Sequence, residues 1–151
     1  MTSADSAATP SPGFAWRTVR CAGYAGISVV GLLATWLPNL SYTFAGFMDN
    51  FMNDLKLTPA SRSYTGDLVV LALAVVVLMV VEARKHDVKF VWLYILGGFA
   101  IAISFTFPLF LIAREMRMNH VDSERVRTVD VALVMVVALL VVGQIVWVSL
   151  A

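Results

Sequence analysis

Four long runs of apolar residues constrain this chain more than any other feature of its sequence. A helix that crosses the hydrocarbon layer of a bilayer, about 30 Å thick, needs about 20 mostly apolar residues. The runs meet or nearly meet that length, and they predict spans over about 18–37, 64–83, 90–113 and 131–150. Backbone groups in lipid must be paired internally, and the runs lack the alternation of a barrel strand, so we expect helices. The predicted fold class is all-α, an integral membrane helical bundle with four transmembrane helices.

Composition supports a membrane location and excludes several other classes of protein. Apolar residues make up 60% of the chain and charged residues 14%, with a mean hydropathy of +0.82. Soluble domains are about 45–50% apolar and about 25% charged. The balance excludes a disordered chain and an ordinary soluble enzyme, and the single cysteine excludes a disulfide scaffold. A net charge of +1 without a basic block argues against nucleic acid as a partner, which leaves the lipid bilayer.

The remaining segments predict a tail, an interfacial segment and aromatic anchors. We expect residues 1–13 to be a disordered N-terminal tail and residues 14–151 to form one transmembrane domain. Residues 40–57 are too polar to span, but their apolar residues recur at helical spacing, which predicts an amphipathic segment in the interface. Tryptophans near predicted helix ends are typical of interfacial anchors. These are Trp16, Trp36, Trp92 and Trp147.

Ionisable residues near the spans are the candidate functional residues, because charge at membrane depth is costly. If the second and third helices are antiparallel, Asp67 approaches Arg114 and Glu115, with Asn53 arriving from the preceding segment. One interpretation is an Asp67–Arg114 ion pair. The other is a polar pocket in which one carboxyl group stays protonated near neutral pH. Glu82 is expected to belong to a separate cluster of charged residues that is solvated or touches lipid headgroups.

Small residues on the predicted third helix indicate helix packing. Gly97, Ala100, Ser104 and Pro108 lie on or beside one stripe, which lets a neighbouring helix approach closely. Gln144 is the only strongly polar side chain within the fourth span, and we expect it to hydrogen-bond to another helix. The spans contain no histidine or lysine suited to haem or retinal, and no zinc spacing is present. We therefore expect no cofactor and no metal.

The orientation of the chain is weakly determined by its charges. With four spans, one membrane face carries Arg17, Arg20, Arg84, Lys85 and Lys89, and the other carries Lys56, Arg62, Arg114, Arg117, Arg125 and Arg127. The first helix usually dominates orientation, and its basic flank precedes it. We therefore expect both termini in the cytoplasm.

The order of these features resembles a bacterial family of small membrane proteins known only as a domain of unknown function. The resemblance covers about residues 31–115. Its most specific mark is the stretch Pro108-Leu109-Phe110-Leu111 followed by Arg114-Glu115. The other marks are Leu37-Pro38, Phe51, Asn53, Asp67-Leu68, Glu82, Arg84, Trp92 and Ser104. The resemblance implies a three-span protein of a bacterial plasma membrane, to which residues 131–151 would be an addition, and it implies no reaction.

Three hypotheses for function follow. The first is a non-enzymatic helical bundle that associates with itself or with a larger membrane complex. The second is a membrane-embedded lipid or isoprenoid cyclase or isomerase, in which Asp67 or Glu115 protonates an alkene and Arg114 tunes the acid. The third is a carrier of small solutes or protons with Asp67 and Glu82 at the two ends of one helix, although no polar residue lies between them.

Overall fold

The chain folds as a bundle of helices in a computed structural model that describes residues 12–118 and 128–150. No strand occurs within these ranges, which confirms the all-α fold class. Part of the expected N-terminal tail lies outside them, and the last two residues of that tail are helical. The elements are α1 (Pro12–Asn39), a 3-10 helix η1 (Phe44–Gly46), α2 (Phe47–Leu57), α3 (Pro59–Lys85), α4 (Val91–Ala100), α5 (Ile103–Arg117) and α6 (Thr128–Leu150).

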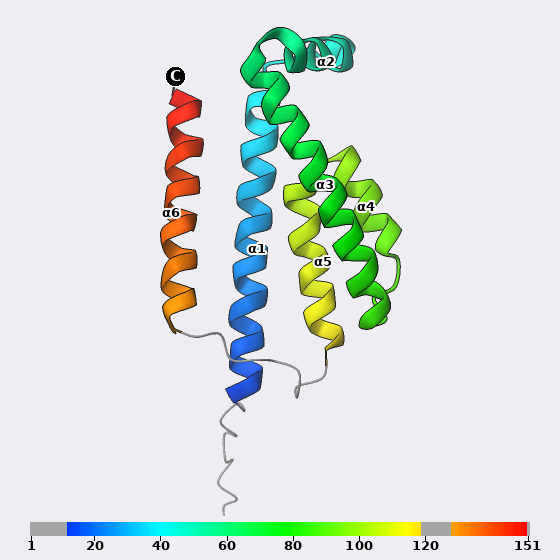
Figure 1. The fold of residues 1–151 in the computed structure, drawn as a ribbon, viewed down its shortest axis with the longest axis vertical. Coiled ribbons are helices and arrows are strands. Elements are labelled where there is room, and N and C mark those ends of the chain that lie inside the picture. The colour runs from blue at the N-terminus through cyan, green and yellow to red at the C-terminus, as the bar shows by residue number, and fades with distance from the viewer. Residues whose placement is uncertain (1–11, 119–127, 151) are drawn as a thin grey trace, which may run out of the picture.

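Three helices are long and apolar enough to cross a membrane. They are Trp16–Asn39 in α1, Pro59–Lys85 in α3 and Thr128–Trp147 in α6. The three run side by side, and α1 and α6 both begin at the end of the bundle where α3 finishes (Figure 1). Residues 12 and 150 consequently lie at opposite ends of the molecule. The prediction that this is a membrane-embedded chain is confirmed.

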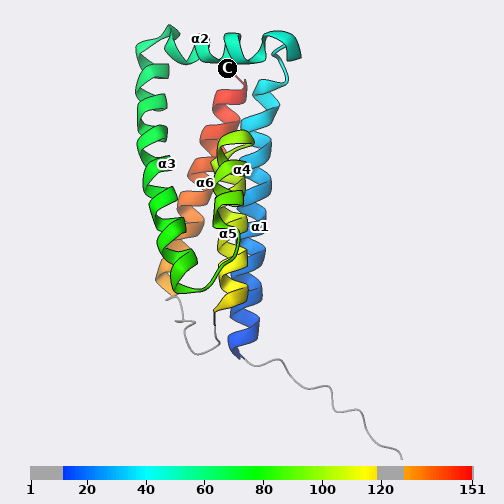
Figure 2. The same cartoon turned by 90° about the vertical axis from the view of Figure 1, so that its right-hand side faces the viewer.

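The predicted third span, 90–113, is instead a helical hairpin made of α4 and α5. The ten residues of α4 cover about 15 Å, half the thickness of the hydrocarbon layer. The chain reverses at Ile101 and Ala102, and α5 returns towards the end of the bundle from which α4 came (Figures 1 and 2). The sequence-based expectation of one continuous helix here is corrected accordingly.

Hydrogen bonds from other residues stabilise this reversal. The Trp36 side chain on α1 donates from Nε1 to the Ile101 carbonyl at 3.2 Å. The backbone N–H groups of Phe105 and Thr106 donate to the Ala102 carbonyl at 3.2 and 3.1 Å. Non-helical backbone is tolerated at membrane depth when protein groups satisfy it, as they do here. Tertiary contacts with α1 therefore allow the apolar run to turn back.

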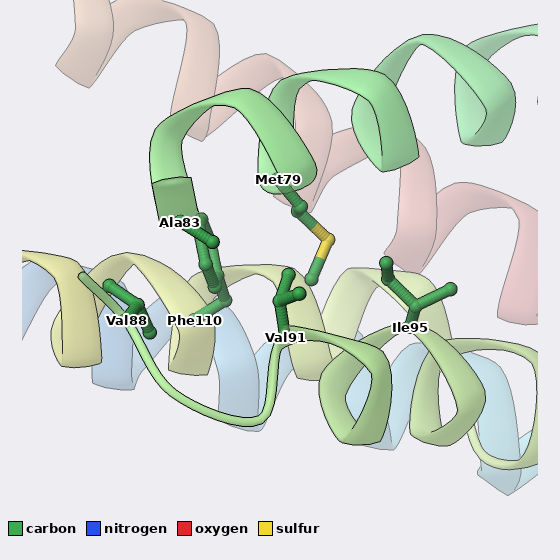
Figure 3. Close-up of a cluster of buried hydrophobic side chains, with 6 residues drawn as sticks. All are labelled: Met79, Ala83, Val88, Val91, Ile95 and Phe110. Atoms are coloured by element: carbon green, nitrogen blue, oxygen red, sulfur yellow. The ribbon is translucent and has the colours of Figure 1, made fainter. Parts of the chain in front are cut away.

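A small apolar core joins the hairpin to α3. Phe110 of α5 is fully buried, and it packs with residues at the end of α3, in the α3–α4 loop and along α4 (Figure 3). The cluster consists of Met79, Ala83, Val88, Val91, Ile95 and Phe110. The half of α3 nearer Pro59 has no buried residue. The protein core thus lies beside the α3–α4 loop, and the rest of α3 faces its surroundings.

The amphipathic segment predicted at 40–57 forms η1 and α2, which lie across the end of the bundle, perpendicular to the long helices (Figures 1 and 2). Phe47 stacks on both Trp36 and Phe51, which fixes α2 to the end of α1. The Tyr42 hydroxyl donates to the Asp54 carboxylate at 2.5 Å. A capping box at Thr58 then begins α3, with Pro59 in the first helical position.

Candidate functional site: an ion-pair network

Glu115 on α5 is the only carboxylate among the described residues that the fold buries. Glu115 is 2% exposed, and two guanidinium groups lie beside its carboxylate. Arg20 of α1 places Nη2 3.3 Å from Oε2, and Arg114 places Nη1 3.8 Å from Oε1. A buried carboxylate requires compensating charge, and here that charge comes from two helices.

Glu82 at the end of α3 extends this network. Its Oε2 accepts a hydrogen bond from Arg114 Nε, and His86 Nε2 lies 3.3 Å from the same oxygen. Arg114 therefore contacts carboxylates on both α3 and α5. The five side chains Arg20, Glu82, His86, Arg114 and Glu115 form one network that joins α1, α3 and α5. We call it the basal network, because it lies at the end of the bundle opposite α2.

The hairpin explains why Arg114 pairs with Glu82 and not with Asp67. A continuous third span would carry Arg114 and Glu115 to the end of the bundle where α3 begins. Because the chain reverses after α4, α5 delivers both residues to the end where α3 finishes. Asp67 lies fifteen residues from Glu82 along α3, about 22 Å away, and its side chain is exposed. The residues Asn53, Asp67, Arg114 and Glu115 are therefore not gathered into one pocket.

The other sequence-predicted residues are distributed over several surfaces. Asn53 is exposed on α2, and Ala100 is exposed at the end of α4. Pro108 is buried within α5. Three of the four tryptophans present large exposed surfaces, and these are Trp36, Trp92 and Trp147. Such exposure is typical of interfacial side chains, although their depth in a bilayer stays a prediction.

Small residues allow the closest contacts between helices. A Cβ added at Gly31 of α1 would stand 2.7 Å from the Ser104 carbonyl oxygen of α5. Beside this contact, the Ser28 hydroxyl donates to the Phe105 carbonyl at 2.9 Å. Within the hairpin, Cβ atoms added at Gly97 and Gly98 would meet Thr106 at 3.3 and 3.0 Å. Gly97 thus packs within the hairpin, and Ser104 packs against α1.

The basal network can serve as an electrostatic clamp that holds the hairpin against two spanning helices. Three buried nitrogen atoms of the network have no hydrogen-bond partner among the described residues. They are Arg20 Nε, Arg20 Nη2 and His86 Nε2. No group of three or more histidine, cysteine, aspartate or glutamate side chains in the described ranges is placed to hold a metal ion. Sequence reasoning missed Arg20, Glu82 and His86 as members of this site.

The fold and the basal network define an all-α, membrane-embedded protein with a helical hairpin clamped between spanning helices. The chain belongs to the family described as "Protein of unknown function DUF2834", which matches residues 24–116, more than half of the chain. The match confirms the resemblance to a domain of unknown function, and it ends before α6 begins. No curated protein and no solved structure matches this chain.

Proposed function

We propose that this chain is a non-enzymatic membrane protein that acts by associating with further copies of itself through its exposed spanning helices. One observation carries the proposal. Gln144 is a strongly polar side chain on α6, a helix that has no buried residue between positions 128 and 147. Gln144 has no hydrogen bond with any described residue.

A glutamine in this position favours helix association. An amide that faces hydrocarbon keeps its donors and its acceptor unpaired, which costs free energy. Helices in membranes relieve that cost by hydrogen bonding across an interface, often beside small residues. Gly143 precedes Gln144, and a Cβ added there would meet nothing within 4 Å. The surface around Gln144 is therefore open to a neighbouring helix.

Subunit counting by single-molecule photobleaching in lipid vesicles tests the proposal. We expect a mixture of monomers and larger assemblies that shifts towards monomers as the protein-to-lipid ratio falls. Gln144→Leu should weaken association by about 3- to 10-fold, which is the effect of one interhelical hydrogen bond in a membrane. Gln144→Asn keeps the amide and should preserve most of it. A strict monomer at every ratio would overturn the proposal.

We place the chain in a bacterial plasma membrane, and the distribution of basic residues supports an orientation with the basal network in the cytoplasm. In the described ranges, Lys56 and Arg62 are the basic residues at the α2 end, while seven lie at the basal end. These seven are Arg17, Arg20, Arg84, Lys85, Lys89, Arg114 and Arg117. Lysine and arginine near the ends of spans favour the cytoplasmic side. With three spans, residue 12 would then be cytoplasmic and residue 150 would be outside, in place of the expected cytoplasmic position of both termini.

The two alternatives from the sequence have weaker support. The isomerase hypothesis needs Asp67 and Glu115 beside one pocket, and these side chains lie at opposite ends of the bundle. The carrier hypothesis needs polar groups between Asp67 and Glu82, and the α3 segment that joins them has none.

A further inference from the structure

We propose that the partner of Gln144 is Asp67 on α3 of a second copy. Copies with the same orientation in the membrane then associate through two different surfaces, with α6 of one copy against α3 of the next. The inference rests on the proposed self-association and specifies its surfaces. The two side chains are complementary, because the amide of glutamine donates and the carboxyl group of aspartate accepts.

Asp67 lacks a partner in the same way as Gln144. Its side chain is exposed, and it makes no hydrogen bond or ion pair with any described residue. The residues that follow it on α3 are apolar and exposed, including Leu68, Val69 and Val70. Asp67 lies about 12 Å along α3 from the start of the helix. Its side chain is short, so the carboxyl group does not extend far towards water. A partner that supplies hydrogen bonds would therefore stabilise it.

The two residues lie at the same depth. Arg20 on α1 and Glu82 on α3 both belong to the basal network and give a common reference level. Thr35 on α1 and Asp67 on α3 each lie fifteen residues from this level, which is about 22 Å along either helix towards the α2 end.

The α6 helix lies beside α1, with which it makes only sparse contact. A hollow of about 150 Å³ between the two helices is lined by Ile145 together with Val30, Leu33, Ala34, Leu37 and Pro38. Gln144, next to Ile145, is thus level with Thr35 and with Asp67. Two copies in one membrane share the same depth, so these polar groups meet without tilting either copy.

Within one chain the two residues are kept apart. The α6 helix lies beside α1, on the side away from α4 and α5, and it makes no extensive contact with α3 (Figures 1 and 2). Ile145 faces α1, so Gln144 points about 100° away from that contact. Two different surfaces that meet in this way form a heterologous interface, which builds rings or open arrays.

Cysteine cross-linking in membranes tests the inference. In a Cys21→Ala background, one chain carries Leu71→Cys and the other carries Leu140→Cys. Each leucine lies four residues deeper in the membrane than Asp67 or Gln144, about 40° around the helix and so on the same face. Oxidation of the mixed chains should give a disulfide-linked heterodimer, and each variant alone should give little.

Matched controls use leucines on other faces. Leu139 and Leu140 are both 68% exposed, but Leu139 lies about 140° from Gln144. Leu73 lies about 120° from Asp67 and is also exposed. Pairing Leu139→Cys with Leu71→Cys, or Leu140→Cys with Leu73→Cys, should lower the heterodimer yield at least fivefold. Equal yields for all pairs would overturn the inference.

The remaining outcomes separate this inference from the proposed function. Cross-linking of Leu140→Cys to itself would indicate a symmetric α6 interface, which overturns the pairing and leaves self-association in place. A disulfide within one chain that carries both Leu71→Cys and Leu140→Cys would also overturn it. Monomers by photobleaching together with no cross-link would overturn both proposals.

A double-mutant cycle gives a second measurement. Asp67→Leu and Gln144→Leu should each weaken association about 3- to 10-fold, and the double variant should weaken it no more than either one. Both side chains are exposed in the single chain, so the variants should fold normally. Additive effects would overturn the pairing.

Discussion

Glu82 and Arg114 are separated by 32 positions in the sequence, yet their ion pair joins the end of α3 to the end of α5. The pair exists because the apolar run between them reverses direction inside the bundle. Arg114 also lies 3.8 Å from Glu115, so one guanidinium group contacts the carboxylates of two helices.

The buried carboxylate should contribute strongly to stability. Glu115→Gln leaves Arg20 and Arg114 without its charge, and breaking a buried ion pair costs about 3 kcal/mol. Thermal and denaturant unfolding in detergent, followed by tryptophan fluorescence, measures the change. Asp87→Asn is the control, because Asp87 is exposed near the same end and has a positive φ that asparagine accepts. Equal destabilisation by both variants would refute a structural role for the basal network.

The contact between α1 and α5 should be sensitive to a single methyl group. Gly31→Ala places Cβ 2.7 Å from the backbone oxygen of Ser104, so the helices must separate, at a cost of about 1–3 kcal/mol. Gly26→Ala on the same helix meets nothing within 4 Å and should be neutral or stabilising by up to about 1 kcal/mol. The free energies of unfolding of the two variants give the comparison, and a harmless Gly31→Ala would show that α1 and α5 do not approach so closely.

The hairpin should determine which residues are accessible from each side of the membrane. If α4 and α5 form a hairpin, a cysteine at Arg117 lies on the opposite side from one at Lys56, whereas a fourth span would place both on the same side. In a Cys21→Ala background, a membrane-impermeant thiol reagent added to intact cells should label Lys56→Cys and spare Arg117→Cys. Permeabilised cells provide the control, since both cysteines should then react. Labelling of both in intact cells would restore a four-span topology.

The contact between Tyr42 and Asp54 should respond to high pH. Donation of the phenol hydrogen to Asp54 is the main cause that raises the pKa of Tyr42 above its usual value of about 10. Because the folded pKa is the higher one, the stabilisation is complete below pH 10 and is lost as the pH rises through the raised value. Ultraviolet absorbance of tyrosinate, with Tyr42→Phe subtracted, reports this titration. Asp54→Asn should lower the pKa, and an unchanged titration would exclude the contact.

Much of the fold follows from local sequence signals. The lengths of the apolar runs predict the three helices that are long enough to span a membrane. The hairpin could not be predicted in this way, because residues 90–113 are long enough for one span and the reversal at Ile101 and Ala102 has no turn sequence of its own. It depends on packing against α1, which is distant in the sequence and includes the hydrogen bond from Trp36.

The same long-range effect explains the candidate site. Arg114 and Glu115 are recognisable as costly residues, but their partners depend on the direction of α5. Arg20 and Glu82 lie near the ends of the predicted spans 18–37 and 64–83, where charged residues are usually solvated, so sequence alone favours exposure over pairing. The adjacent glycines Gly97 and Gly98, which permit close packing against Thr106, were the one local sign of a hairpin.

The hairpin also makes the molecule unequal across the thickness of the membrane. At the level of Phe110, the helices α1, α3, α5 and α6 share the membrane plane with the start of α4, whereas beyond Ile101 only the three long helices remain (Figure 1). The lipids of one leaflet therefore surround a wide protein, and those of the other leaflet surround a narrow one. A dense array of such wedges would relieve the mismatch in area by curving the bilayer, with the wide basal end on the convex side.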